Sequence, residues 1–164
     1  MKPVVIYYSL TGKTAIVATA AARILNAEIK IIEEVHPYKP GPLVYLFGGL
    51  AAGTGQGSRL KPLDFTPDKY DFIMVGSPVW AGKPVPAVNA FIAKTDFKGR
   101  DVLVFCTAGG DLKGTEVAIR TMTQKIEAKN GKVIGSFAIR TAKATEQELV
   151  EKTREEVRKY RGRK

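Results

Sequence analysis

The chain has 164 residues, 26 Lys and Arg against 16 Asp and Glu, and a formal net charge of +10. Its length and 45% hydrophobic content suit one globular domain, residues 1–164, and exclude a disordered or fibrous chain. No segment reaches the roughly 20 apolar residues that a membrane span needs. The apolar run within the first ten residues, MKPVVIYYSL, is too short for a secretory signal. With a single cysteine, no internal disulfide forms, and we expect a cytoplasmic protein.

The basic charge favours anionic ligands or partners without identifying them. Basic residues are scattered along the chain, and their densest cluster, within 158–164, fits a solvated helix end. This distribution does not favour nucleic acid as the partner.

Strand-like and helix-like segments alternate along the chain, which predicts a parallel sheet between helical layers, an α/β three-layer αβα sandwich. Apolar runs predict strands, and apolar residues at helical spacing predict helices. In chain order we expect a strand at 3–8, a helix at 14–26, strands at 27–33 and 70–76, a helix at 85–93, a strand at 101–107, a helix at 115–130, a strand at 132–139 and a helix at 145–160, which starts with a capping box.

The segment 37–69 does not follow this alternation, because it is rich in proline and glycine. One interpretation is a short helix at 43–50 followed by a surface loop. The other is a flap over the site, or a surface that contacts a partner or a second subunit.

The clearest chemical motif is the turn Ser9-Leu10-Thr11-Gly12-Lys13-Thr14, between the first strand and the first helix. Free N–H groups and the positive end of the helix dipole bind anions there, and three hydroxyls and a lysine add further donors. A single hydroxyl would be explained as a helix cap, but three favour a phosphate site.

Other nucleotide motifs are absent from this turn. A P-loop needs a glycine where this chain has Tyr7, and the dinucleotide fingerprint GxGxxG does not occur after the strand. Cys106 lacks the arginine of a Cys-x5-Arg phosphatase, since Leu112 stands at that position, and is expected to be a small buried residue. His36, the only histidine, has no partners for a metal site or a catalytic triad.

Two further loops, GSPVWAG at 76–82 and TAGGD at 107–111, follow the third and fourth expected strands. Together with YYSLTGKT, which is similar to the flavodoxin phosphate loop, they resemble the loops of the flavodoxin family. The resemblance implies a five-stranded parallel sheet of order 2-1-3-4-5 that binds flavin mononucleotide (FMN). By this resemblance the first loop holds the phosphate, the second holds the flavin ring and the third holds the ring's other edge. The cofactor-binding residues that it implies are Ser9, Thr11, Gly12, Lys13, Thr14, Pro78, Val79, Trp80, Ala81, Gly82, Thr107, Ala108, Gly109, Gly110 and Asp111.

The second and third loops differ in aromatic content. Trp80 offers a flat aromatic face. We expect it to stack on the flavin instead of packing in the core, because a Pro-Val-Trp-Ala-Gly turn is a poor place for a core residue. Residues 107–111 contain no aromatic residue, so one face of the flavin is open or covered by Tyr45 or Phe47. An open face suits hydride delivery or a quinone better than simple electron carriage.

Three functions therefore remain open. The first is an FMN-dependent electron-transfer protein with a redox partner protein or a small-molecule electron donor or acceptor. The second is a flavoenzyme on the same fold, either an NAD(P)H or quinone reductase or a porphyrinogen oxidase. The third is a flavin-free module that binds an anionic partner through its basic surface.

Overall fold

The computed structural model describes residues 1–41, 50 and 57–161. In these residues five parallel strands form a sheet of order β2-β1-β3-β5-β6, with a two-residue strand paired to β3 outside this path. The strands are β1 (Pro3–Tyr7), β2 (Glu28–Ile31), β3 (Phe72–Trp80), β4 (Lys83–Pro84), β5 (Asp101–Ala108) and β6 (Lys132–Arg140). Counting only the parallel strands, this is the predicted order 2-1-3-4-5, which is confirmed.

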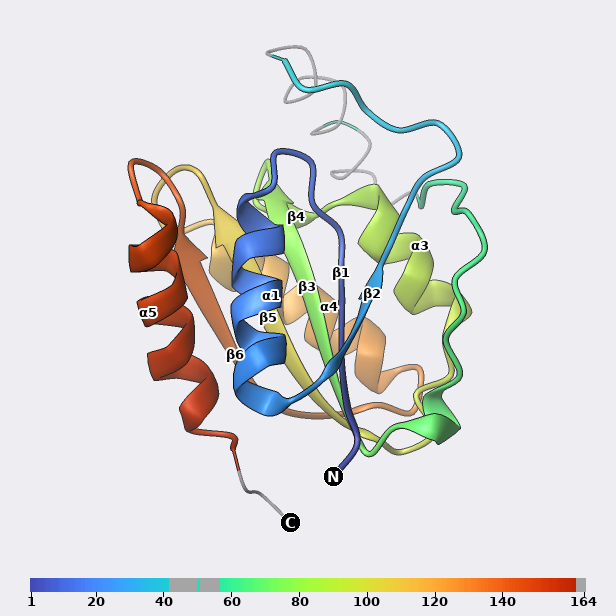
Figure 1. Ribbon diagram of the computed structural model, residues 1–164. Helices are drawn as coiled ribbons and strands as arrows, with labels where there is room; N and C mark the ends of the chain where they lie inside the picture. Colours follow the sequence, from blue (N-terminus) through green and yellow to red (C-terminus); the bar gives the residue numbers. More distant parts are fainter. Residues whose placement is uncertain (42–49, 51–56, 162–164) are drawn as a thin grey trace.

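Helices cover both faces of the sheet, so the three-layer sandwich is confirmed (Figure 1). One layer holds α1 (Lys13–Leu25) and α5 (Glu146–Arg158), and the other holds α3 (Pro86–Lys94) and α4 (Thr115–Glu127). A 3-10 turn, η1 (Pro67–Lys69), leads into β3. Each layer seals its own cluster of buried side chains against the sheet.

The central strands are buried because both faces of the sheet are covered. Every residue of β1 is buried, and so is most of β3 and β5, whereas the edge strand β2 is largely exposed. A glycine is required at position 76, where an added Cβ would lie 2.0 Å from Phe105 Cζ of the neighbouring strand. Close packing in the middle of the sheet therefore fixes the register of β3 on β5.

The strand β3 runs further than its apolar pattern predicts, to Trp80 rather than residue 76. Pairing with β5 continues to Pro78↔Thr107, and Trp80 then pairs with Lys83 of β4. Ala81 and Gly82 both have positive φ, 48° and 72°, as a tight two-residue hairpin turn requires. The predicted loop at 76–82 is thus mostly a strand end and a hairpin.

Helix ends follow local capping chemistry. The capping box of α5 is confirmed, since the Thr145 hydroxyl accepts from Glu148 N–H and the Glu148 carboxylate accepts from Thr145 N–H. Helix α4 ends three residues before Asn130, which adopts φ 61°.

The expected helix at 43–50 lies outside the described residues apart from Leu50, and so do Tyr45, Phe47 and residues 162–164. No helix in the described part of the chain is long and apolar enough to span a membrane.

Candidate functional site

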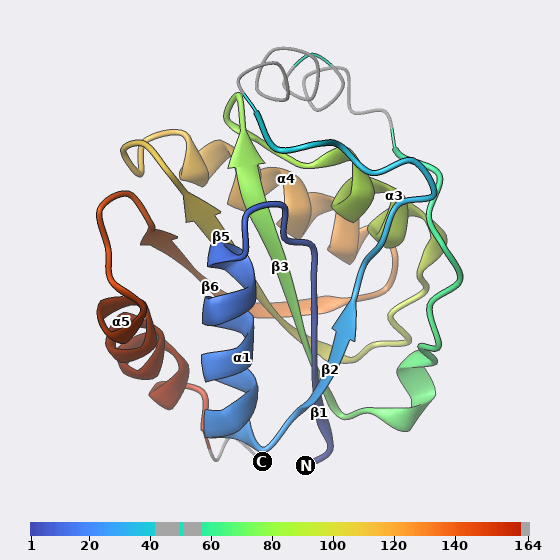
Figure 2. The same cartoon turned by 45° about the horizontal axis from the view of Figure 1, so that its top comes forward.

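The carboxyl ends of four neighbouring strands surround a cavity of about 100 Å³. The loops that follow β1, β3 and β5 lie at this end of the sheet, which Figure 2 turns toward the viewer. Ligands of open α/β sheets bind at this edge. The cavity is lined by Leu10, Thr11, Lys13, Thr14, Pro78, Val79, Trp80, Thr107, Gly109 and Thr141, so it brings residues of all three predicted loops together.

The turn before α1 has the geometry of an anion site. Gly12 adopts φ 90° and the helix begins at Lys13, so the first N–H groups of α1 point to the end of the helix without partners inside it. Thr11 is exposed beside them and lines the cavity. The positive end of the helix dipole therefore faces the part of the cavity that Thr11 and Thr14 line.

Ser9 has a capping role in this turn. Its Oγ accepts hydrogen bonds from the N–H groups of Gly12 at 3.1 Å and Ala15 at 3.3 Å. It does not line the cavity, and neither does Gly12. The cap interpretation, which the sequence allowed for one hydroxyl, thus applies to Ser9, while Thr11 and Thr14 line the cavity.

A hydrogen bond joins the first and third loops. Thr14 Oγ1 and Thr107 Oγ1 are 2.8 Å apart, both residues are 3% exposed, and either hydroxyl can be the donor. The contact links the first turn of α1 to the end of β5 across 93 residues of sequence. It holds the phosphate loop and the third loop at a fixed separation.

Lys13 reaches across the cavity edge rather than into solvent. Its Nζ donates to the carbonyl oxygen of Ala144 at 3.3 Å, in the connection between β6 and α5. The ammonium group therefore carries positive charge along the rim of the cavity, and it ties this connection to the phosphate loop.

Trp80 is a core residue in part, which corrects the expectation that its turn keeps it out of the core. Its side chain is 4% exposed and packs edge-to-face against Tyr8, with ring centroids 6.1 Å apart, and against Tyr38, at 5.3 Å. The physical reason is the extension of β3, which places Trp80 in the sheet. Trp80 also lines the cavity and forms part of its wall, and its stacking on a flavin stays a prediction.

Several predicted residues lie beside the cavity without lining it. Ala81 and Gly82 form the hairpin turn, and Ala108 is the last residue of β5. Asp111 accepts a hydrogen bond from Lys113 N–H at 3.0 Å, which makes it a turn residue. Gly110 is exposed, and of the third loop only Thr107 and Gly109 reach the cavity.

Sequence reasoning missed two lining residues, Leu10 and Thr141. Thr141 directly follows β6, and its N–H and hydroxyl both donate to the carbonyl oxygen of Ala108, at 2.8 and 3.2 Å. The available signal was position, because a hydroxyl residue after the last parallel strand lies at the same edge of the sheet as the other loops.

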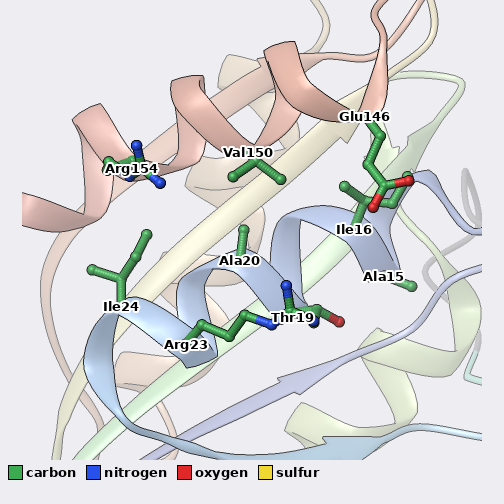
Figure 3. Close-up of a pocket in the computed structure, with 9 residues that line it drawn as sticks. All are labelled: Ala15, Ile16, Thr19, Ala20, Arg23, Ile24, Glu146, Val150 and Arg154. Carbon is green, nitrogen blue, oxygen red and sulfur yellow. The ribbon is translucent and has the colours of Figure 1, made fainter.

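A wider groove of about 300 Å³ lies between α1 and α5, where Ile16, Ala20, Ile24 and Val150 face one another (Figure 3). It shares no lining residue with the cavity, and none of the predicted site residues lines it. Most of the predicted residues that line a cavity therefore converge at the carboxyl ends of the strands.

Other reactive groups are accounted for by packing. Cys106 is fully buried in β5, and burial raises the pKa of its thiol to about 12, which confirms it as a small core residue. Within residues 1–41, 50 and 57–161 there is no group of three or more side chains that could hold a metal ion.

The flavodoxin family model matches residues 57–153, more than half of the chain. The chain belongs to the flavodoxin family. The match covers the second and third loops and begins after the phosphate loop. The assignment of the turn at 9–14 as a phosphate loop therefore rests on its geometry and not on this match. A comparison of the sequence with curated proteins finds no match.

Flavodoxins and flavoproteins of known structure share this fold. A flavoprotein from Lactobacillus acidophilus NCFM, solved in complex with FMN, has 22% identity and a TM-score of 0.70 over 93% of this chain and 98% of that one. Oxidised flavodoxin 2 from Bacillus cereus has 17% identity and a TM-score of 0.63 over 96% and 95%. The flavodoxin, WrbA-like protein from Agrobacterium tumefaciens has 15% identity and a TM-score of 0.65 over 98% and 99%.

Proposed function

We propose that this flavodoxin binds FMN in the cavity at the carboxyl ends of its strands and transfers electrons through it. One observation carries the proposal. The hydroxyl and N–H donors at the start of α1 line the same cavity as the apolar end of β3. FMN has a matching distribution of chemical groups, with a phosphate at one end and a flat aromatic ring at the other. The FMN complex of the Lactobacillus acidophilus flavoprotein supports the assignment.

The donor set fits a phosphate that is bound without a metal. Thr11 and Thr14 each supply a hydroxyl, and the N–H groups of the first helical turn add charge-assisted hydrogen bonds. If Thr107 donates to Thr14, the Thr14 proton remains free for a phosphate oxygen. Lys13 adds positive charge at the rim.

The ring end of FMN would lie against Pro78, Val79 and Trp80. These side chains exclude water from one side of the cofactor and orient it. When bound, FMN supplies the redox chemistry, and the protein supplies binding, orientation and electrostatics. A cytoplasmic location remains a prediction from the sequence.

A reductase that takes electrons from NAD(P)H or passes them to a quinone is the second candidate. The observation that favours it is the third loop, where residues 107–111 carry no aromatic side chain to cover the ring. Loss of the flavin's visible absorption on addition of NADPH alone would support the reductase. A flavin that only a protein partner reduces would support the carrier.

The test is a fluorescence titration of the purified protein with FMN, riboflavin and FAD. The Thr11→Ala and Thr14→Ala variants should weaken FMN by about 10- to 100-fold, because each loses a hydrogen bond to a charged group worth roughly 1.5–3 kcal/mol. Their affinity for riboflavin, which has no phosphate, should change little. Thr121→Ala is a matched control, since that hydroxyl bonds to Val117 O on the exposed side of α4.

Two outcomes would count against the proposal. Equal losses for FMN and riboflavin would contradict the phosphate-loop assignment. A protein that binds none of the three flavins would refute the proposal and favour the flavin-free module, for which salt-sensitive binding of an anionic partner is the test.

A further inference from the structure

A buried carboxylate lies close to the cavity. Glu34, three residues after β2, is 3% exposed. From Ile31 to Val35 the residues alternate between exposed and buried, and Glu34 occupies an inward position, like Ile32. A backbone bridge between Glu34 and Leu60 fixes this orientation. The acidic side chain therefore stands where the strand pattern calls for a core residue.

Glu34 has a neutral partner. Its Oε2 accepts a hydrogen bond from the Tyr8 hydroxyl at 3.0 Å, and no ion pair involves it among the described residues. The neighbouring Glu33, in contrast, is exposed and pairs with Lys61 at 3.3 Å. An apolar side chain would fill the inward position at lower cost, because burying a carboxylate is unfavourable unless its hydrogen bonds compensate. The carboxylate therefore needs another explanation.

The Tyr8 ring connects Glu34 to the cavity wall. It contacts the ring of Trp80 nearly at right angles, with an interplanar angle of 85°, and Tyr38 meets Trp80 in the same way from another position, at 87°. Trp80 lines the cavity, and Tyr8 directly precedes the phosphate loop. Glu34, Tyr8, Trp80 and Tyr38 thus form one cluster behind the proposed flavin site, which we call the aromatic wall.

The aromatic wall has open space on one side, although Tyr8 and Trp80 are only 5% and 4% exposed. This second cavity, of about 250 Å³, borders Tyr8, Tyr38 and Glu34 and also Leu10, which lines the first cavity as well. A ring with open space beside it can change orientation unless a directional contact fixes it. The hydrogen bond from Tyr8 to Glu34 is such a contact. Burial and the Glu34 carboxylate raise the pKa of Tyr8, so its hydroxyl stays protonated and keeps donating.

We propose that Glu34 is a positioning residue, which fixes the ring of Tyr8 and through it the side chain of Trp80 against the flavin cavity. The effect on Trp80 depends only on the contacts of this chain. The effect on flavin affinity rests on the proposed function.

Trp80 is the only tryptophan in the chain, so its emission reports directly on the aromatic wall. In the flavin-free protein, Glu34→Ala and Tyr8→Phe should shift the emission maximum to longer wavelength and raise quenching by acrylamide at least twofold. Glu34→Gln keeps an oxygen that accepts from Tyr8, and it should retain the emission of the unchanged protein. This conservative variant also separates positioning from a loss of folding.

Tyr70→Phe is the matched control. The Tyr70 hydroxyl donates to Glu28 at 2.7 Å, and Tyr70 is as buried as Tyr8, but its ring stacks on Phe65 instead of Trp80. If the loss of a tyrosine–glutamate hydrogen bond acted only by loosening the structure, Tyr8→Phe and Tyr70→Phe would change the emission of Trp80 alike. The proposal requires that Tyr70→Phe leave the emission and the quenching of Trp80 unchanged.

The flavin arm uses the same variants. Glu34→Ala and Tyr8→Phe should weaken FMN and riboflavin by the same factor, about three- to tenfold, because Trp80 contacts the ring end that both ligands share. Unchanged emission in both variants, or an equal change in Tyr70→Phe, would overturn the positioning role. Changed emission with unchanged flavin affinity would overturn its link to the cofactor. If the unchanged protein binds no flavin, the proposed function fails, and the emission data still decide the role of Glu34.

Discussion

The bond between Thr14 and Thr107 allows a prediction that separates structure from function. Both hydroxyls are buried and they are 2.8 Å apart, so replacing either threonine with valine keeps the shape and leaves one buried hydroxyl without its partner. That costs about 1–3 kcal/mol of the free energy of unfolding. In the Thr14→Val/Thr107→Val double variant no orphan hydroxyl remains, and the loss should largely disappear. The expected coupling energy is therefore the sum of the two single losses, about 2–6 kcal/mol in magnitude.

Urea unfolding of the four flavin-free proteins measures this cycle, provided that the m-values agree. FMN titration of the same proteins should give a different pattern. The double variant should recover stability but not FMN affinity, because Thr14→Val removes a proposed donor to the phosphate. Strictly additive losses of stability would show that the hydroxyls act independently and would refute the contact. Recovery of FMN affinity in the double variant would refute the role of Thr14.

Three further predictions follow from the fold and the charge. Gly76→Ala should lower the free energy of unfolding in urea by at least about 1–3 kcal/mol, because the new Cβ would overlap the buried ring of Phe105. Gly109→Ala is the control and should change stability little, because a Cβ added there would meet no atom within 4 Å. Cys106 should react with thiol reagents at pH 8 only after denaturation, since burial raises the pKa of its thiol to about 12, and labelling of the folded protein at the rate of a free thiol would contradict this. The midpoint potential of bound FMN should decrease when the salt concentration is raised from 0.1 to 1 M, because the Debye length then shortens from about 10 to about 3 Å. This screening weakens the stabilisation of the negatively charged reduced flavin by the net charge of +10. A potential as low as that of typical carrier flavodoxins would contradict that reasoning.

The fold could be predicted because its signals are local. Central parallel strands are apolar on both faces, so 70–76 and 101–107 stand out as continuous runs, and the Thr145–Glu148 capping box marks the start of α5. The phosphate turn could be predicted for a similar reason, because hydroxyls, glycine and a helix start are adjacent in sequence. Strand order follows from the family resemblance rather than from these patterns.

The remaining parts of the site depend on contacts between segments that are distant in sequence. The pairing of Trp80 with Lys83 and of Pro78 with Thr107 extends β3 beyond its apolar run, which places Trp80 in the wall of the cavity. Thr141 reaches the cavity only because β6 lies beside β5. Glu34 carries no apolar signal at all, and its burial follows from the bridge to Leu60.

The burial of Trp80 also bears on the choice between carrier and reductase. It is the one aromatic side chain among the described residues that line the cavity, and it is 4% exposed. Residues 107–111 add no ring on the other side. A hydride donor or a quinone must approach a flavin face directly, whereas a protein partner can exchange electrons through an edge. The contacts with Tyr8 and Tyr38 hold Trp80 in the wall but do not decide this access, so the loss of flavin absorption with NADPH alone is the measurement that separates the two functions.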